Sequence, residues 1–226
     1  AFMLSSLGMA VLMPMNAFYI VSVLEAPEKY LPILMFFTSI ISLFAIPMWV
    51  KVSERVGKHR AWAIGLMVVL VVSPTYLFLG PGQFLLMVPF ALVSAIGIGA
   101  FQALPNSMKA DVIDIDTART GENRAAMFFS AWSLATKAAG SIGGSLGLYA
   151  LSFIGFDAGP GAVNTPEAIM GLKYSYALMP AVIFVLAGLV VWNYPLTKVR
   201  QKRIRDAIDR RDARRLAAAE VQARVA

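Results

Sequence analysis

The sequence predicts an all-α integral membrane protein in which six transmembrane helices form one bundle. Its 226 residues are 58% hydrophobic and 15% charged, whereas a soluble domain has about 25% charged residues. Six apolar segments are long enough to cross a bilayer, which takes about twenty residues in a helix. None shows the two-residue alternation of a membrane β-strand, so helices are expected. The predicted helices cover residues 2–23, 31–50, 61–80, 84–108, 126–155 and 172–194.

The positive charge of the chain is concentrated at its C-terminal end. The formal net charge is +7, and ten of the twenty Lys and Arg residues follow Pro195. We therefore expect a six-helix transmembrane bundle over residues 1–195 and a basic, helical cytoplasmic tail over residues 196–226. No aromatic residues are interspersed with the basic residues of the tail, so nucleic acid is not an expected partner. The lipid bilayer, with its anionic surface, is the expected partner instead.

Basic residues also distinguish the two sides of the predicted bundle. The segments 51–60 and 109–124 carry four and three of them, whereas the connections 80–83 and 156–171 carry none. Because basic loops stay in the cytoplasm, both termini are expected to be cytoplasmic. The chain starts at Ala1 without the basic region of a signal peptide, and it looks like the middle of a longer chain.

The first segment carries two polar side chains on one face. Asn16 and Tyr19 lie three residues apart, shortly after Pro14, which is expected to kink the helix. Either Asn16 is a buried amide that bonds to a neighbouring helix, or the two side chains line a cavity. The sequence leaves both interpretations open.

A similar pair closes the fourth segment. Gln102 and Asn106 are four residues apart, so both amides face the same way, toward protein or water rather than lipid. Earlier in this segment, Gly97 and Gly99 are expected to allow a neighbouring helix to approach closely.

The fifth segment contains the most unusual residue of the chain, Lys137. It lies about 16 Å above the start of its helix, near the middle of the membrane, where its side chain reaches neither surface easily. A charge at that depth costs at least a few kcal/mol, so Lys137 is predicted to face a partner carboxylate or a water-filled cavity, as is Ser133 one turn earlier. The glycines that follow have the spacing of tight helix contacts, Gly140 with Gly144 and Gly143 with Gly147.

No motif of enzyme chemistry occurs in the sequence. The chain has no cysteine and one histidine, which excludes a disulfide framework and a Cys-based or His-rich metal site. No G-x-S-x-G, HExxH, Walker A or Rossmann fingerprint is present. The sequence therefore predicts a protein that is not an enzyme and holds no metal or cofactor. It favours movement of a solute rather than reaction of it.

One stretch of the sequence resembles a known family. Ala110-Asp111-Val112-Ile113-Asp114, then Gly121 and Arg124, then Ser130 and Lys137, resemble the cytoplasmic loop and eleventh helix of the glycoside–pentoside–hexuronide:cation symporters. These carriers are the melibiose-carrier-like branch of the major facilitator superfamily. The run Glu54-Arg55-Val56-Gly57-Lys58 is similar to the superfamily's D-R-x-G-[RK] loop, with Glu in place of Asp. The chain departs from the family at Ile115-Asp116-Thr117, where an aromatic-Gly-Glu run is common.

The resemblance implies a particular place for this chain in a larger carrier. A family member has twelve helices in two bundles, with the solute between them, and this chain resembles the C-terminal half. Its partner would be the N-terminal six-helix half of the same carrier. That half would supply most of the groups that bind the coupling cation, Na⁺ or H⁺. The implied activity is symport of a sugar or glycoside by alternating access in a bacterial inner membrane.

The resemblance and the helical spacing together give two sets of candidate residues. The candidates for the pathway of solute and cation are Lys137, Ser133, Asn16, Tyr19, Gln102 and Asn106. The candidates for a cytoplasmic gate are Asp111, Asp114, Arg119 and Arg124.

Two other classes of membrane protein stay open on the sequence alone. The first is a six-helix subunit of a multi-component permease of the ABC type, and the second is a fragment that transports nothing. The sequence upstream of Ala1 distinguishes the first class from the symporter, because six further apolar segments with intramembrane aspartates would support the symporter. The second class is distinguished by whether the isolated 226 residues insert stably and move a labelled glycoside.

Overall fold

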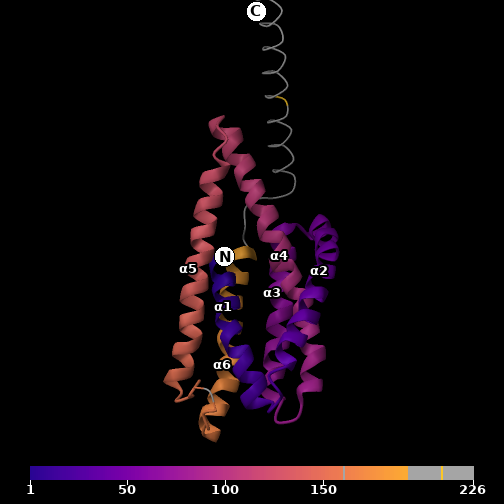
Figure 1. Cartoon of the computed structure of the whole chain (residues 1–226). Helices are drawn as coiled ribbons and strands as arrows, with labels where there is room; N and C mark the ends of the chain where they lie inside the picture. Colours follow the sequence, from indigo (N-terminus) through magenta and orange to yellow (C-terminus); the bar gives the residue numbers. More distant parts are fainter. Residues whose placement is uncertain (160, 193–209, 211–226) are drawn as a thin grey trace, which may run out of the picture.

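The computed structural model describes residues 1–159, 161–192 and 210, and the elements of this part of the chain are all helices (Figure 1). The six α-helices are α1 (Phe2–Phe18), α2 (Tyr30–Val56), α3 (Lys58–Val72), α4 (Phe84–Thr120), α5 (Ala125–Phe153) and α6 (Pro166–Trp192). α1 continues into a π-helix, η1 (Tyr19–Val23), and α3 continues into a 3₁₀-helix, η2 (Ser73–Phe78). Apart from Arg210, the predicted tail over 196–226 lies outside the described residues.

Five of the six helices in the described part are long and apolar enough to cross a bilayer, namely α1 with η1, α2, α3 with η2, α4 and α6. α5 is not among them, although its 29 residues exceed the about twenty that a crossing needs. Its serines, its glycines and Lys137 lower its hydropathy. α5 nevertheless packs lengthwise along α1 (Figure 1), so it runs beside the other helices as part of the same bundle.

The largest difference from the predicted boundaries is at the end of α4. The charged segment 109–124 is expected to be a loop, but α4 continues without a break to Thr120. No Pro or Gly lies between Pro105 and Gly121, and charged side chains end a membrane span without ending a helix. Gly121 closes α4 in the left-handed conformation, with a φ of 79°, which glycine adopts without strain. The predicted loop is therefore a helical extension followed by a short turn over residues 121–124.

The helices pack in the pattern of an internal repeat. α1 packs along α5 as α4 packs along α2, and α1 packs on α6 as α4 packs on α3. α3 packs on α6, and smaller contacts join α2 to α3 and α5 to α6, so exchanging α1–α3 with α4–α6 leaves the pattern unchanged. Repeats of this kind are common in transporter folds. In Figure 1, α5 and α2 accordingly lie on opposite flanks, with the other helices between them.

Glycines of α5 set its distance from α1. A Cβ atom added at Gly143 would lie 2.6 Å from the Cβ of Ala10, and Gly147 is similarly close to α1. Gly140 and Gly144 have nothing within 4 Å of such an atom. Of the two predicted glycine pairs, the second therefore makes the helix contact, and the first lies on the open side of α5.

Glycines of α4 do the same for its two neighbours. A Cβ atom added at Gly97 would lie 2.6 Å from the carbonyl oxygen of Gly65 in α3. One added at Gly99 would lie 2.6 Å from the carbonyl oxygen of Ser42 in α2. The close helix approach predicted for Gly97 and Gly99 is confirmed.

Candidate functional site

Lys137 lies on the exposed side of α5, beside the face that packs on α1. Ser133, one turn earlier, is exposed as well, and Gly140 and Gly144 continue the same open strip. Within the described part of the chain, no residue forms a hydrogen bond or an ion pair with the Lys137 ammonium. A charge on such a face has to be compensated by water or by groups other than the described residues.

The amides of α4 also lie on an exposed face. The Gln102 Nε2 donates to the Ser42 hydroxyl at 3.3 Å, which ties this face to α2. The Asn106 Nδ2 donates to the Gln102 carbonyl oxygen at 3.0 Å, and the Lys109 Nζ donates to the Asn106 Oδ1 at 3.4 Å. The predicted pairing of Gln102 with Asn106 on one side of the helix is present, and Lys109 extends it by one turn.

Lys109 connects this polar strip to α5. Its Nζ lies 4.3 Å from the ring centroid of Phe129 and 4.9 Å from that of Trp132. Trp132 in turn stacks on Phe2 of α1, with ring centroids 3.9 Å apart. Cation–π contacts of this kind stabilise by roughly 0.5–2 kcal/mol, depending on how dry they are. They join α4 and α5 about three helical turns of α4 before the turn that connects these two helices.

Asn16 and Tyr19 have different surroundings, although they share a face of the first segment. The Tyr19 side chain is fully buried, and its hydroxyl donates to the Tyr76 carbonyl oxygen at 2.5 Å. Its ring stacks on Tyr176 with centroids 4.4 Å apart. Asn16 is only partly buried and lines a small cavity. Tyr19 therefore packs in the interior of the bundle, and Asn16 alone of the two faces a space.

Asp111 is paired within the bundle. Both of its carboxylate oxygens accept from the Lys58 ammonium, at 2.7 Å each. The Asp111 side chain is 9% exposed and that of Lys58 is 28% exposed. The pair joins the first residue of α3 to α4 at the point where α4 becomes charged.

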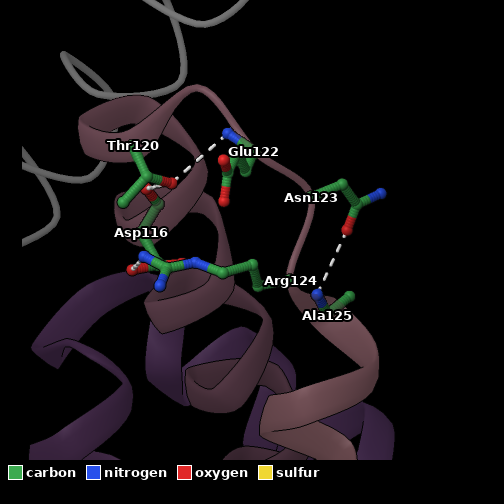
Figure 2. A network of polar contacts seen from close by, with 6 residues as sticks. All are labelled: Asp116, Thr120, Glu122, Asn123, Arg124 and Ala125. Carbon is green, nitrogen blue, oxygen red and sulfur yellow. Dashed lines mark hydrogen bonds and ion pairs between the residues drawn. The ribbon is translucent and has the colours of Figure 1, made fainter.

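A second ion pair holds the turn between α4 and α5 (Figure 2). The Arg124 guanidinium donates from Nε and Nη2 to the two carboxylate oxygens of Asp116, at 3.1 and 2.9 Å. The Thr120 hydroxyl accepts from the Glu122 amide at 3.3 Å, which supports the same turn (Figure 2). Two-pronged pairs of this kind fix geometry as well as charge.

Asp114 and Arg119 lie on the same extension of α4 without comparable contacts. Asp114 is partly buried and Arg119 is exposed, and among the described residues neither forms an ion pair. Of the four predicted gate residues, the structure therefore gives partners to Asp111 and Arg124.

Three residues of these contacts were missed by the sequence reasoning. Lys58 is part of a motif that the sequence identified, but a basic residue in a connecting loop is expected to lie in water. Lys109 has the same appearance in sequence. Asp116 stands where the resemblance to the family breaks down, so nothing pointed to it. The contacts of all three residues depend on the continuation of α4 to Thr120, because this extension brings them within reach of their partners.

Comparison of the sequence with known proteins finds a matching family and several relatives. The family described as MFS/sugar transport protein matches residues 1–198. A glucuronide carrier protein homolog of Escherichia coli (strain K12) is 33% identical over 161 residues, which cover 70% of this chain and 34% of that protein. The uncharacterized symporter YjmB of Bacillus subtilis (strain 168) is 28% identical over 155 residues, 68% of this chain and 33% of its own length.

A more distant organism supplies a third relative. The sodium-dependent lysophosphatidylcholine symporter 1-A of Danio rerio is 27% identical over 210 residues, which cover 89% of this chain and 38% of that protein. All three relatives are named as carriers or symporters rather than enzymes. The chain spans about a third of the length of the relatives it matches.

The fold and the family match together define a multi-pass membrane protein of the major facilitator superfamily. Within that superfamily, the chain belongs to the glycoside–pentoside–hexuronide:cation symporter family, as its resemblance implied.

Proposed function

We propose that this chain is the C-terminal half of a symporter that moves a sugar or glycoside together with Na⁺ or H⁺ by alternating access. The family match and the one-third coverage of its relatives support a chain that works as part of a longer carrier. The name of the Escherichia coli relative favours a glycoside as the solute, and that of the Danio rerio relative favours Na⁺ as the coupling ion.

The observation that carries this proposal is the open position of Lys137. Its ammonium has no partner among the described residues, although it lies about eighteen Å along α5 from the start of that helix. A second six-helix half that places carboxylates opposite α5 would supply the missing charge. The solute and the cation would then share the space between Lys137, Ser133 and the amides of α4.

The charged end of the bundle is proposed to close this space on the inner side of a bacterial membrane. The basic segments 51–60 and 109–124 lie at that end, which supports the inference that both termini of the chain are cytoplasmic. The Lys58–Asp111 and Asp116–Arg124 pairs hold the ends of α3, α4 and α5 together. Asp114 and Arg119 remain available for contacts with the other half when the carrier faces outward.

The test is uptake by the full-length carrier carrying Lys137→Ala. Membranes with the wild type are expected to accumulate a labelled glycoside, screened from methyl glucuronides, galactosides and xylosides, when a Na⁺ or H⁺ gradient is imposed. Lys137→Ala should reduce this coupled uptake at least about tenfold, because an intramembrane charge supports the ion pathway. Its amount in the membrane should stay near that of the wild type.

Lys173→Ala is the matched control, since Lys173 is also a lysine in a membrane helix but lies near the start of α6. It should keep most of the coupled uptake. Wild-type coupled uptake in Lys137→Ala would remove the proposed role of this lysine. The absence of uptake of every glycoside by the wild type would instead overturn the proposed solute class.

A further inference from the structure

A small cavity lies inside the bundle, away from the open face of α5. It has a volume of about 110 Å³ and is walled by residues of α1, α2, η2, α4 and α6. Its polar lining consists of Asn16, Thr38, Ser73, Tyr76, Ser94 and Tyr176. Its wall also includes the exposed Met35 of α2, so it reaches the surface of the bundle.

Two polar atoms in this lining lack a normal hydrogen bond. The Asn16 Oδ1 is buried and has no partner within the described residues. The Ser94 hydroxyl lies beside the Tyr76 phenol but forms no hydrogen bond of normal geometry in this part of the chain. An unsatisfied buried polar group costs about 1–3 kcal/mol. A ligand that bonds to both atoms would remove that cost.

The backbone around the cavity is irregular on two sides. α1 changes into the π-helix η1 at Tyr19, one turn after Asn16, and α3 changes into the 3₁₀-helix η2 at Ser73. The Tyr19 hydroxyl, which donates to the Tyr76 carbonyl oxygen, ties the two irregular segments together. At membrane depth, irregular backbone is tolerated where it is buried in protein or lines a cavity that holds water or a ligand.

Three oxygen atoms of the lining call for a ligand that donates hydrogen bonds, whereas the Ser94 hydroxyl can donate as well as accept. The Ser73 hydroxyl already donates to the Ala177 carbonyl oxygen at 2.5 Å, and the Thr38 hydroxyl donates to the Leu34 carbonyl oxygen at 2.9 Å. Both hydroxyls can therefore only accept from a ligand, as can the Asn16 Oδ1.

Charge and size narrow the ligand further. Among the described residues that line the cavity, none is an acid or a base, so an ammonium, a metal cation or a carboxylate would be buried without a counter-charge. The cavity of about 110 Å³ has room for several water molecules. A space of this size takes a hydroxymethyl group or a ring hydroxyl with its carbon.

We propose that this cavity is a recognition subsite for one uncharged, hydroxyl-bearing arm of the transported solute, which donates to the Asn16 Oδ1 and displaces water. This inference rests on the proposed transport of a glycoside. It adds Ser73, Tyr76 and Ser94 to the residues that contact the solute.

The test compares hydroxyl discrimination in variants of the full-length carrier. Uptake of the labelled methyl glycoside that the wild type transports is inhibited with the same glycoside and with its single-deoxy analogues. The variants are Asn16→Leu and the milder Ser94→Ala, which removes one oxygen and is expected to fold normally. Ser6→Ala is the matched control, because the Ser6 hydroxyl is also buried and unpartnered among the described residues but does not line the cavity.

In the wild type, the loss of one particular hydroxyl should weaken inhibition about ten- to hundredfold, the effect of leaving buried polar groups unpaired. In Asn16→Leu and in Ser94→Ala, that deoxy analogue should inhibit uptake only about threefold less strongly than the parent glycoside, or less than that. The other analogues should behave as they do with the wild type. Ser6→Ala should retain the wild-type difference. Discrimination that is unchanged in both variants would show that the cavity holds water only and would overturn the subsite. A wild type that transports no glycoside would overturn the proposed function and the subsite with it.

Discussion

The Lys58 ammonium lies 2.7 Å from each carboxylate oxygen of Asp111, and the two residues are 53 positions apart in the chain. The Asp111 side chain is almost completely out of water, while Lys58 is partly hydrated. The carboxylate is therefore the member of the pair that depends more on its partner. This asymmetry decides what each substitution should do.

Lys58→Met should lower the free energy of unfolding of the full-length carrier by about 2–4 kcal/mol, because it removes the ammonium and leaves a buried carboxylate. The double variant Lys58→Met with Asp111→Leu should recover most of that loss, since both charges are then gone. Thermal unfolding of the purified carrier measures both. Equal losses in the single and the double variant would mean that the ion pair does not stabilise the bundle in this way.

Asp111→Asn should slow the transport cycle more than it weakens solute binding. The amide keeps the shape of the carboxylate but loses its attraction to Lys58, so the balance between carrier conformations changes while the solute contacts do not. Transport rate and the Kd for the solute, measured on the same membranes, separate the two effects. A loss confined to solute affinity would assign Asp111 to the binding site instead.

Arg124→Gln and Arg119→Gln form a matched pair at the turn between α4 and α5. Arg124 donates twice to Asp116, whereas Arg119 is exposed and forms no ion pair among the described residues. Arg124→Gln should cost up to about 1 kcal/mol of stability, because the pair is partly solvated, and should slow transport. Arg119→Gln should leave stability unchanged in thermal unfolding. A larger loss from Arg119→Gln would contradict the contacts of this turn.

Gly143→Ala and Gly144→Ala test the packing of α5 on α1 with neighbouring residues. The methyl group added at Gly143 would meet the Cβ of Ala10 at 2.6 Å, whereas nothing lies within 4 Å at Gly144. Overpacking of this kind costs about 1–3 kcal/mol, so Gly143→Ala should lower the unfolding temperature of the carrier. Gly144→Ala should keep it or raise it slightly, because alanine favours the helix. The reverse order would contradict the rotation of α5 about its axis.

The sequence predicted the helices well because apolar length is a direct physical requirement of a bilayer. Asp111, Arg124, Gln102 and Asn106 were chosen as candidates because their residue types are unusual in or next to an apolar helix; the structure gives each of them a contact, and their roles in transport stay predictions. The sequence predicted that Tyr19 shares the surroundings of Asn16, whereas the structure buries Tyr19 inside the bundle. Helical spacing alone cannot show that the chain leaves regular helical geometry at Tyr19. Partners far apart in sequence, such as Lys58 for Asp111, could not be predicted because they depend on how α3 packs against α4.

α4 has 37 residues, so it is about 55 Å long at 1.5 Å per residue, nearly twice the thickness of the hydrocarbon layer. It carries Gln102 and Asn106 within the membrane and Asp111 and Asp116 beyond them on one continuous helix. Pro105 lies between Gln102 and the two aspartates and removes a backbone hydrogen bond of the helix, so a bend is most easily made there. A bend of α4 at Pro105 would therefore carry Asp111 and Asp116 through a longer path than Gln102, so this one helix can couple the position of its charged end to that of its polar face.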